Sequence, residues 1–184
     1  MIEPGAIILF KTTARFVIEG RPEALGTEEH PIILVPAEGW NGFYFAPNDH
    51  DLQVLEYVVI PESAPLPRRV VQSEGASLQI NRCSLRALRS CLDINHGRLW
   101  ASRNLLVIHG QYSSSVSIRN LENDQTRCSA QSNRLTGNII KADVPEAADP
   151  WIPSPTEFTC GLYLDGSTNL CMWDNTVSVI ASGS

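Results

Sequence analysis

Long hydrophobic runs are absent from this 184-residue sequence. The longest uninterrupted apolar stretches are residues 6–10 and 32–35, whereas a membrane-spanning helix needs about 20 apolar residues. The first five residues, Met-Ile-Glu-Pro-Gly, include no basic segment followed by an apolar core, so the sequence as given shows no secretory signal. We therefore expect no membrane partner, and a chain that is either cytoplasmic or a fragment of a secreted or surface protein.

Metal-ligand motifs are also absent. No Cys-x-x-Cys occurs, and none of the four histidines lies at a metal-ligand spacing from a cysteine. Residues 49–51 read Asp-His-Asp, which is most simply a polar loop, so we expect no metal and no cofactor. The five cysteines are Cys83, Cys91, Cys128, Cys160 and Cys171. We expect them to be mainly buried free thiols, with one disulfide between Cys160 and Cys171 as the alternative.

Charge is distributed in three blocks along the chain. Residues 1–62 carry three basic and ten acidic side chains, residues 68–134 carry ten arginines and four acids, and residues 135–184 carry one lysine and six acids. The net charges are therefore −7, +6 and −5, which sum to −6. Arginine suits bidentate contacts with carboxylates, sulfates or phosphates. The middle block predicts either ion pairs with the acidic blocks or an anion-binding surface, and we expect no nucleic-acid partner.

Short β-type stretches recur at a regular spacing. Five stretches that are rich in aromatic or β-branched side chains and bounded by Gly, Pro or Asn cover residues 7–9, 16–18, 32–34, 43–45 and 58–60. Ile33 lies midway between Ile8 and Val58 in the sequence, and the step from Val17 to Tyr44 is only slightly longer. A fixed period of about 20–50 residues is typical of a solenoid, in which each repeat stacks only on its neighbours.

The period continues, with drift, toward the end of the chain. One constant, shorter shift aligns Leu78 with Leu99 and Leu85 with Leu106. Asp, Gly and Asn, which favour turns, separate the last alternating stretches at residues 162–164, 170–172 and 177–179. We therefore predict an all-β, single-stranded right-handed parallel β-helix of about seven coils, forming one domain over residues 1–184.

Two segments depart from the simple pattern. Residues 84–92 fit either a short helix or, within a coil, a strand followed by a turn. Residues 143–157 contain four prolines whereas residues 68–144 contain none, which predicts a stiff loop protruding from the stack. Trp151 lies in that loop, where an exposed aromatic ring suits stacking against a sugar; otherwise the loop is a lid packed onto the stack.

The repeated stretches resemble a known architecture. The segments that carry the resemblance are residues 3–7 (EPGAI), 16–20 (FVIEG), 24–28 (ALGTE), 31–33 (PII), 39–45 (GWNGFYF) and 55–60 (LEYVVI). They resemble successive coils of right-handed parallel β-helix proteins of the bacterial-surface and polysaccharide-active type. Residues 161–169 (GLYLDGSTN) are similar to coils of the carbohydrate-binding and sugar-hydrolase, or pectate-lyase-like, superfamily. The resemblance implies the fold and core or corner packing of Trp40, but no single function, because that superfamily includes lyases, hydrolases, phage tailspikes and adhesins.

The catalytic residues of the resembling enzymes have no clear counterpart in this sequence. Polygalacturonases use clustered aspartates and a His-Gly, but Asp-Asp never occurs, and His96-Gly97 and His109-Gly110 lack the surrounding pattern. Pectate lyases use several Ca²⁺-binding carboxylates, which are scarce in the arginine-rich block. Asp93 is the best single candidate for a catalytic carboxylate, and a solvated strand carboxylate is its simpler interpretation.

Two functions of different classes follow. The favoured hypothesis is a non-catalytic binding or scaffold module that recognises an acidic glycan or a protein partner. The alternative is a polysaccharide lyase or glycoside hydrolase that acts on an acidic polysaccharide. Because an exposed strand edge invites pairing with another chain, we also expect a homo-oligomer, most simply a two-fold dimer.

The expected ligand-binding residues are Arg82, Arg98, Arg103, Arg119 and Trp151. The shift that aligns Leu78 with Leu99 also aligns Arg82 with Arg103 and Arg98 with Arg119, so we predict two stacked arginine pairs. Like charges ~4.8 Å apart on neighbouring strands repel each other. We expect that repulsion to be relieved either by an anionic ligand or by acids from the two acidic blocks.

Overall fold

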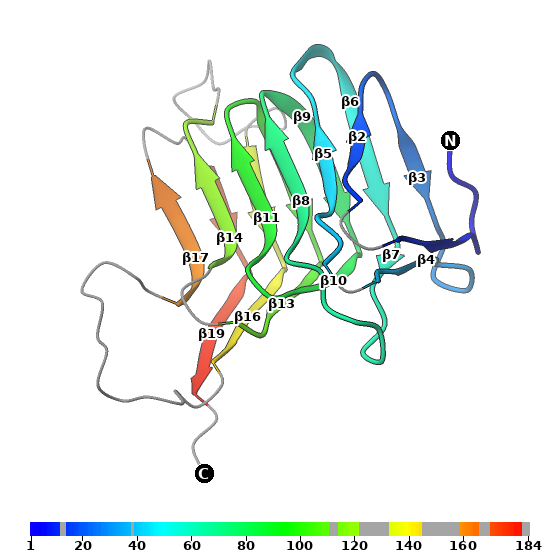
Figure 1. Ribbon diagram of the computed structural model, residues 1–184. Coiled ribbons are helices and arrows are strands. Elements are labelled where there is room, and N and C mark those ends of the chain that lie inside the picture. The colour runs from blue at the N-terminus through cyan, green and yellow to red at the C-terminus, as the bar shows by residue number, and fades with distance from the viewer. Residues whose placement is uncertain are drawn as a thin grey trace.

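The computed structural model describes residues 1–11, 14–37, 39–110, 114–121, 133–144, 159–165 and 170–181. All regular elements in these residues are β-strands, and all the strand pairs are parallel. Each strand pairs with the strand three places further along the chain, which generates a parallel β-helix of six to seven stacked coils (Figure 1). The predicted β-helix is thus confirmed. The described residues include no helix that could cross a membrane.

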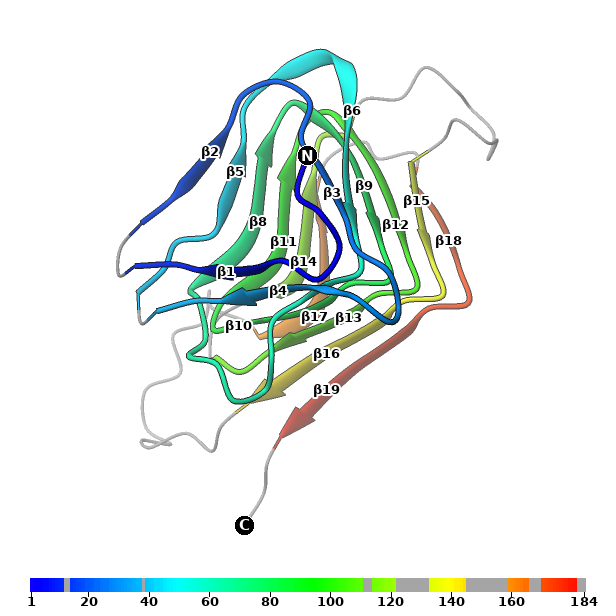
Figure 2. The ribbon, with the colours of Figure 1, turned by 90° about the vertical axis from the view of Figure 1, so that its right-hand side faces the viewer.

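Each full coil contributes one strand to each of three sheets, which the chain visits in the order C, A, B (Figure 2). Sheet C contains β2 (Phe16–Ile18), β5 (Phe43–Phe45), β8 (Arg69–Glu74), β11 (Ser90–Asn95), β14 (Ser114–Arg119) and β17 (Cys160–Asp165). Sheet A contains β3 (Glu23–Leu25), β6 (Asn48–Glu56), β9 (Ala76–Asn81), β12 (Arg98–Ser102), β15 (Asn133–Thr136) and β18 (Leu170–Trp173). Sheet B contains β1 (Ile7–Leu9), β4 (Ile32–Val35), β7 (Val58–Val59), β10 (Ser84–Ala87), β13 (Leu105–Ile108), β16 (Ile139–Val144) and β19 (Thr176–Ala181).

The three sheets enclose one hydrophobic core (Figure 2). Because side chains alternate between the two faces of a strand, Ala76, Leu78 and Ile80 of β9 all point inward and are fully buried. Leu78 lies opposite Leu99 of the next coil, as the constant shift predicts. Burying a leucine side chain contributes roughly 1.5–3 kcal/mol, so the stacked interior side chains hold the coils together.

An aromatic cluster fills the core near the first turns of the stack. Trp40 is fully buried and stacks on Phe10 at a centroid distance of 4.0 Å. Phe43 meets the Trp40 indole edge-on at 5.3 Å, a geometry that aromatic quadrupoles favour. The predicted packing of Trp40 in the core is confirmed.

The register corrects two of the predicted spacings. Val17 lies opposite Tyr44, as predicted, but Ile33 lies opposite Ile7 rather than Ile8 and opposite Val59 rather than Val58. The first two steps in sheet B are therefore each one residue longer than the sequence spacing suggested, and both predicted pairings are wrong. A slip of one residue exchanges the two faces of a strand. These strands are apolar on both faces, so alternation does not reveal their register.

The segment 84–92 is not a helix. Residues of β10 and the start of β11 occupy it, with an exposed turn at Leu88 and Arg89 between the two strands. The coil interpretation is confirmed. Arg86 occupies an outward position of β10, and Arg89 lies in the turn.

The corner between sheets A and B has the same backbone conformation in successive coils. The residue that follows each sheet A strand from β6 onward has a positive φ, between 50° and 61°, at Tyr57, Arg82, Arg103, Gly137 and Asp174. Each of the first four donates its backbone N–H to a carbonyl of the following coil, as Arg82 does to Ser102 at 3.0 Å. This conformation is costly for most side chains, so it must be held by its surroundings.

A ladder of asparagines lies directly inside this corner. Asn138 is fully buried, and its Oδ1 accepts hydrogen bonds from the backbone N–H and the Nδ2 of Asn104 at 3.0 and 2.9 Å. Its Nδ2 donates to the Ala101 carbonyl and to Oδ1 of Asn175 at 3.0 and 2.9 Å. Buried polar groups are costly unless they are hydrogen-bonded, and the ladder satisfies the corner in three successive coils.

The prediction of buried free thiols holds only for some of the described cysteines, and the alternative pairing is wrong. Cys83, Cys91 and Cys160 are free, and the first two are buried. Cys171 is disulfide-bonded, but its partner is not Cys160, so the predicted pair is wrong. Cys160 lies opposite Ser114 in sheet C whereas Cys171 lies opposite Arg134 in sheet A, so the two belong to different faces. Cys128 lies outside the described residues.

Replacing Asn138 with alanine should strongly destabilise the stack. Asn138→Ala leaves buried partners in the coils on both sides without hydrogen bonds, and we expect a loss of roughly 2–4 kcal/mol. Asn95→Ala is the control, because the Asn95 side chain bonds only at the exposed surface, and should cost less than about 0.5 kcal/mol. Urea unfolding of both variants measures this; equal losses would contradict the role of the ladder.

The thiols should differ sharply in reactivity. Burial raises the pKa of Cys83 and of Cys91 to about 12, and the thiolate is the reactive form. Cys160 is only partly buried, so we expect a maleimide to label it in the native protein and to label Cys83 and Cys91 only after unfolding. Peptide mapping by mass spectrometry reads out each site. Rapid native labelling of Cys83 would show that the core opens readily.

Candidate ligand-binding groove

The outer face of sheet A presents polar and aromatic side chains in ordered rows. The register places Gln79, Trp100 and Arg134 opposite one another in three successive strands. Since side chains alternate along a strand, the outward residues two positions later form a parallel row. That second row consists of Glu56, Asn81, Ser102, Thr136 and Trp173.

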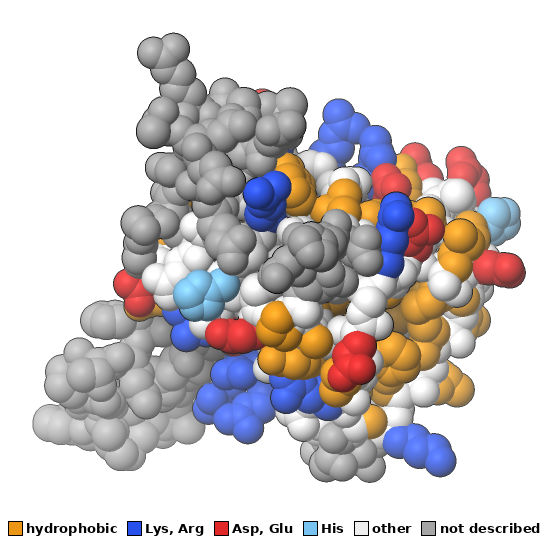
Figure 3. Space-filling view, turned by 90° about the horizontal axis from the view of Figure 1, so that it is seen from above, with side chains coloured by type: hydrophobic (Ala, Val, Ile, Leu, Met, Phe, Trp, Pro, Cys, Tyr) orange, Lys and Arg blue, Asp and Glu red, His pale blue; other side chains and the backbone are white. Residues whose placement is uncertain are grey.

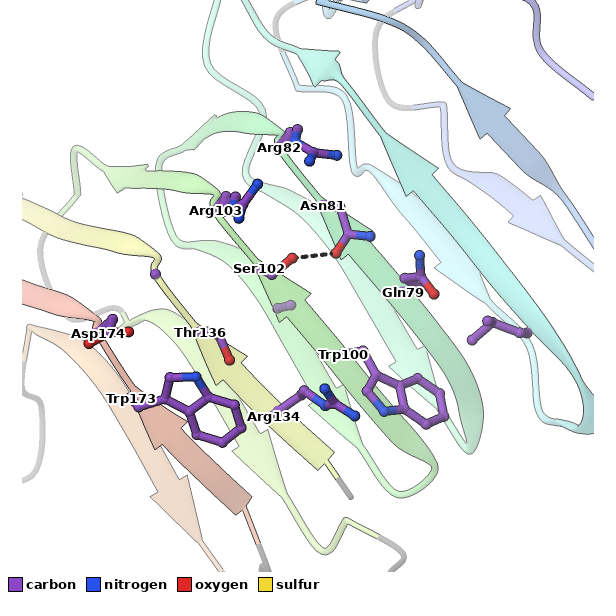
Figure 4. Close-up of a pocket in the computed structure, with 13 residues that line it drawn as sticks. Gln79, Asn81, Arg82, Trp100, Ser102, Arg103, Arg134, Thr136, Trp173 and Asp174 are labelled. Atoms are coloured by element: carbon purple, nitrogen blue, oxygen red, sulfur yellow. Dashed lines mark hydrogen bonds between the residues drawn. The ribbon is translucent and has the colours of Figure 1, made fainter. Parts of the chain in front are cut away.

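A groove of about 690 Å³ lies over these rows. Its aromatic walls are Trp100 of β12 and Trp173 of β18, and Arg134 of β15 lies between the two indoles (Figure 4). Trp173 is 43% exposed, so much of its ring remains open to a ligand. The other lining residues are Leu52, Gln79, Asn81, Arg82, Ala101, Ser102, Arg103, Thr136, Gly137 and Asp174.

The two predicted arginines at the groove are stacked but have different partners. Arg82 and Arg103 occupy equivalent corner positions in successive coils, as their spacing predicts. Arg82 forms an ion pair with Glu56 at 2.8 Å, so an acid from the first acidic block relieves its charge. Arg103 is exposed, and no carboxylate among the described residues lies within ion-pair distance of it. The groove therefore retains a cationic edge at Arg103.

Hydrogen-bonding groups line the floor of the groove. Ser102 donates its hydroxyl to Oδ1 of Asn81 at 2.8 Å (Figure 4). The Oγ1 atom of Thr136 is buried and has no hydrogen-bond partner among the residues that the structure describes. An unsatisfied buried hydroxyl is costly, so a ligand or a water that bonds to Thr136 would be favoured there. The only acid among the described lining residues is Asp174.

Arg98 and Arg119 do not form the predicted stacked pair. Arg98 begins β12 in sheet A, opposite Ser77, whereas Arg119 ends β14 in sheet C, opposite Asn95 and Asp165. The coil that separates Trp100 from its partner Arg134 is longer than the coil between β9 and β12. The shift taken from the shorter coil therefore leads from Arg98 into a different sheet, and this prediction is wrong.

Asp93 lies on sheet C, away from the groove on sheet A. Arg119 donates to its Oδ1 at 2.9 Å, and Arg69 lies 3.7 Å from its Oδ2. The Asp93 side chain is 16% exposed and is therefore enclosed by two cations. Its observed role is that of a shared counter-ion, and no second carboxylate lines the hollow around it in the described residues.

Other candidate positions lie partly outside the described residues. Trp151 and most of the predicted loop at 143–157 lie outside the described residues. The side chains of residues 49–51 also lie outside them, although their backbone belongs to β6. Elsewhere in the described chain no group of three or more His, Cys, Asp or Glu side chains is arranged to hold a metal.

Sequence reasoning missed the two groove tryptophans. The shift that aligned Leu78 with Leu99 also aligns Gln79 with Trp100, which places that indole on the outward face. Trp173 is harder to predict, because the coil between β12 and β15 is longer than the preceding one and the constant shift no longer applies. No family model matches this sequence, and no curated protein or solved structure matches it either.

A separate charged cluster connects β10, β13 and β16. Nε2 of His109 lies 2.9 Å from an Arg86 nitrogen, and Nδ1 of His109 lies 3.5 Å from Asp143. Burial, followed by the Arg86 charge, lowers the pKa of His109, and these effects outweigh the opposing influence of Asp143 and Glu62. Because Arg86 can only donate, His109 must accept at Nε2 and is neutral in this arrangement.

This cluster should make the protein sensitive to mild acid. With the native pKa of His109 below its ordinary value of 6.5, the unfolded state binds more protons as pH falls through that value, and stability decreases. His109→Gln should therefore lose less stability than the wild type between pH 7.5 and 5.5. Urea unfolding at both pH values measures the difference, with the exposed His30→Gln as control. Equal losses in wild type and His109→Gln would exclude this linkage.

Proposed function

We propose that the protein is a non-catalytic binding module that recognises an acidic glycan along the sheet A groove. The observation that carries this proposal is the pair of open indoles, Trp100 and Trp173, with Arg134 between them. Indole rings present a large apolar face, which suits the apolar face of a sugar ring. Arginine suits the carboxylate of a uronic acid because the guanidinium can make two parallel hydrogen bonds to it.

The positions of the aromatic side chains favour an extended ligand. Trp100 and Trp173 belong to strands that are two coils apart, which corresponds to roughly 9.6 Å at ~4.8 Å per coil. An oligosaccharide that runs along the stack would meet the two rings in succession. Arg82 and Arg103 lie at the corner between sheets A and B, at the edge of the same groove. There they would contact acidic groups of the ligand.

The carboxylates favour binding over hydrolysis. A glycosidase uses two carboxylates ~5–9.5 Å apart, and the described groove lining supplies Asp174 alone. Asp93, the best catalytic candidate from the sequence, is on another sheet between Arg69 and Arg119. The resemblance to pectate-lyase-like coils supports glycan chemistry in general. A homo-oligomer remains a prediction for sedimentation to test.

Binding to an acidic polysaccharide should depend on the groove side chains. We expect polygalacturonate to bind the wild type at low salt, and Trp173→Ala and Arg103→Gln each to weaken binding about 5- to 20-fold, or roughly 1–1.8 kcal/mol. Tyr163→Ala and Arg21→Gln are matched controls, since Tyr163 is on sheet C and Arg21 lies outside the groove. Isothermal titration calorimetry gives the affinities.

The same samples distinguish binding from catalysis. Incubation with polygalacturonate and alginate should release neither reducing ends nor unsaturated products. If the wild type cleaved either polymer and Asp93→Ala did not, this result would contradict the binding proposal and support the lyase or hydrolase alternative. Unchanged affinity in Trp173→Ala and Arg103→Gln would show that the groove is not the binding site.

A further inference from the structure

The outer face of sheet C carries a second and separate concentration of arginine. We call it the sheet C arginine surface, and it consists of Arg15, Arg68, Arg69, Arg89 and Arg119. Lys and Arg side chains gather along the lower edge of the view from above, which is the side of sheet C (Figure 3). None of these five residues lines the sheet A groove. The surface therefore needs an explanation of its own.

Two adjoining hollows shape this surface. One, of about 290 Å³, is lined by Arg15, Asn41, Arg68, Arg69 and Gln72. The other, of about 220 Å³, is lined by Arg69, Arg89, Ser90, Asp93, Ser114, Ser117 and Arg119. Arg69 is common to both, so the hollows form one continuous strip that crosses several coils.

Arg68 and Arg89 are stacked neighbours at the centre of the strip. The backbone N–H of Arg89 donates to the Arg68 carbonyl at 2.9 Å, which places the two residues at equivalent positions ~4.8 Å apart in successive coils. Both are exposed, and neither forms an ion pair with a carboxylate of the described chain. Like charges in this arrangement repel each other, and nothing in the described surface offsets them.

The internal counter-charge of the strip is small. Asp93 is the only carboxylate among the described residues that line the two hollows, and Arg69 and Arg119 already share it. Five guanidinium groups thus face one carboxylate. The described residues around these two hollows thus carry four excess positive charges, whereas those around the sheet A groove, three arginines and Asp174, carry two.

This strip is not suited to stacking against sugar rings. The guanidinium of Arg15 lies 3.8 Å from the centre of the Tyr44 ring, so one face of that ring is already covered by a cation–π contact. The remaining polar groups in the second hollow include the hydroxyls of Ser114 and Ser117. Recognition here would rest on charge and hydrogen bonds, in contrast to the indole-lined groove on sheet A.

We propose that the sheet C arginine surface binds tetrahedral oxyanions, namely the sulfate or phosphate groups of a ligand. A planar carboxylate matches one guanidinium fork, whereas a sulfate or phosphate group presents several strong acceptor oxygens in different directions. Arg69 and Arg119 already contact the two oxygens of Asp93 from the coils on either side of it, so arginines of successive coils can contact such a group together. This site does not depend on the glycan-binding groove, because the two share no residue.

Inorganic ions test the chemistry directly. At constant ionic strength, sulfate and phosphate should bind the full chain and acetate should not, as measured by titration calorimetry. The double variant Arg68→Gln/Arg89→Gln should lose at least tenfold in affinity for sulfate, while Arg82→Gln/Arg103→Gln on sheet A should retain it. Acetate binding as tight as sulfate, or equal losses in the two double variants, would overturn the proposal.

A substitution of Asp93 separates an anion site from a merely structural cluster. Asp93→Asn removes the internal carboxylate that competes for Arg69 and Arg119, so affinity for sulfate should rise several-fold. A structural role for Asp93 would instead leave that affinity unchanged or lower it, which would contradict the proposal. Circular dichroism before titration checks that the variant is folded.

Polymers then identify the source of the oxyanion. Tighter binding of dextran sulfate than of polyphosphate would assign a sulfated glycan, and the reverse would assign a phosphorylated polymer; either supports the site if Arg68→Gln/Arg89→Gln abolishes it. A single-stranded oligonucleotide of equal charge that binds more tightly than both would show that groups other than the oxyanion determine the affinity, and would overturn the proposal in favour of a nucleic-acid surface.

Discussion

The hydrogen-bonded corner between sheets A and B is the constraint on which the described coils depend. A chain that turns sharply between two parallel sheets must bury backbone N–H and C=O groups that no strand partner satisfies. Asn104, Asn138 and Asn175 supply these bonds from within, each bonding to backbone of the preceding coil. The ladder fixes the register of the coils at the corner between sheets A and B. It thereby aligns the outward rows that place Trp100 beside Arg134.

Much of the fold could be predicted because the chain alternates strictly wherever one face is polar. In Leu78-Gln79-Ile80 the inward and outward residues differ in polarity, and the predicted pairing with Leu99 is the observed one. In the first coils the strands Ile7–Leu9 and Ile32–Val35 are apolar on both faces. Alternation then carries no information about register, which is why the first two steps in sheet B were each predicted one residue short.

The candidate site was predictable only where the same offset holds on both sides of a residue. Leu78 pairs with Leu99 and Leu85 with Leu106 at one offset, so the stacking of Arg82 and Arg103, which lie between them, could be predicted from the spacing. The coil that follows Arg98 is longer, and the same shift led to a false partner in Arg119. The ion-pair partners were harder still to predict from the sequence. Arg69 and Arg119, which pair with Asp93, belong to the strands on either side of its own strand, and the distance along the sequence does not indicate such a contact.

The same architecture gives its faces different chemistry through what neutralises each arginine. On sheet A, Glu56 of the preceding coil pairs with Arg82, but the equivalent outward position before Arg103 is Asn81, which carries no charge. The unpaired positive charge of Arg103 therefore lies one coil later, in the groove that Trp100 and Trp173 line. Around the two sheet C hollows, the single lining carboxylate, Asp93, is shared by two cations, and the stacked pair Arg68 and Arg89 has no ion-pair partner among the described side chains. A neutral sugar face with an acidic group fits the first environment, whereas only a ligand with concentrated negative charge fits the second.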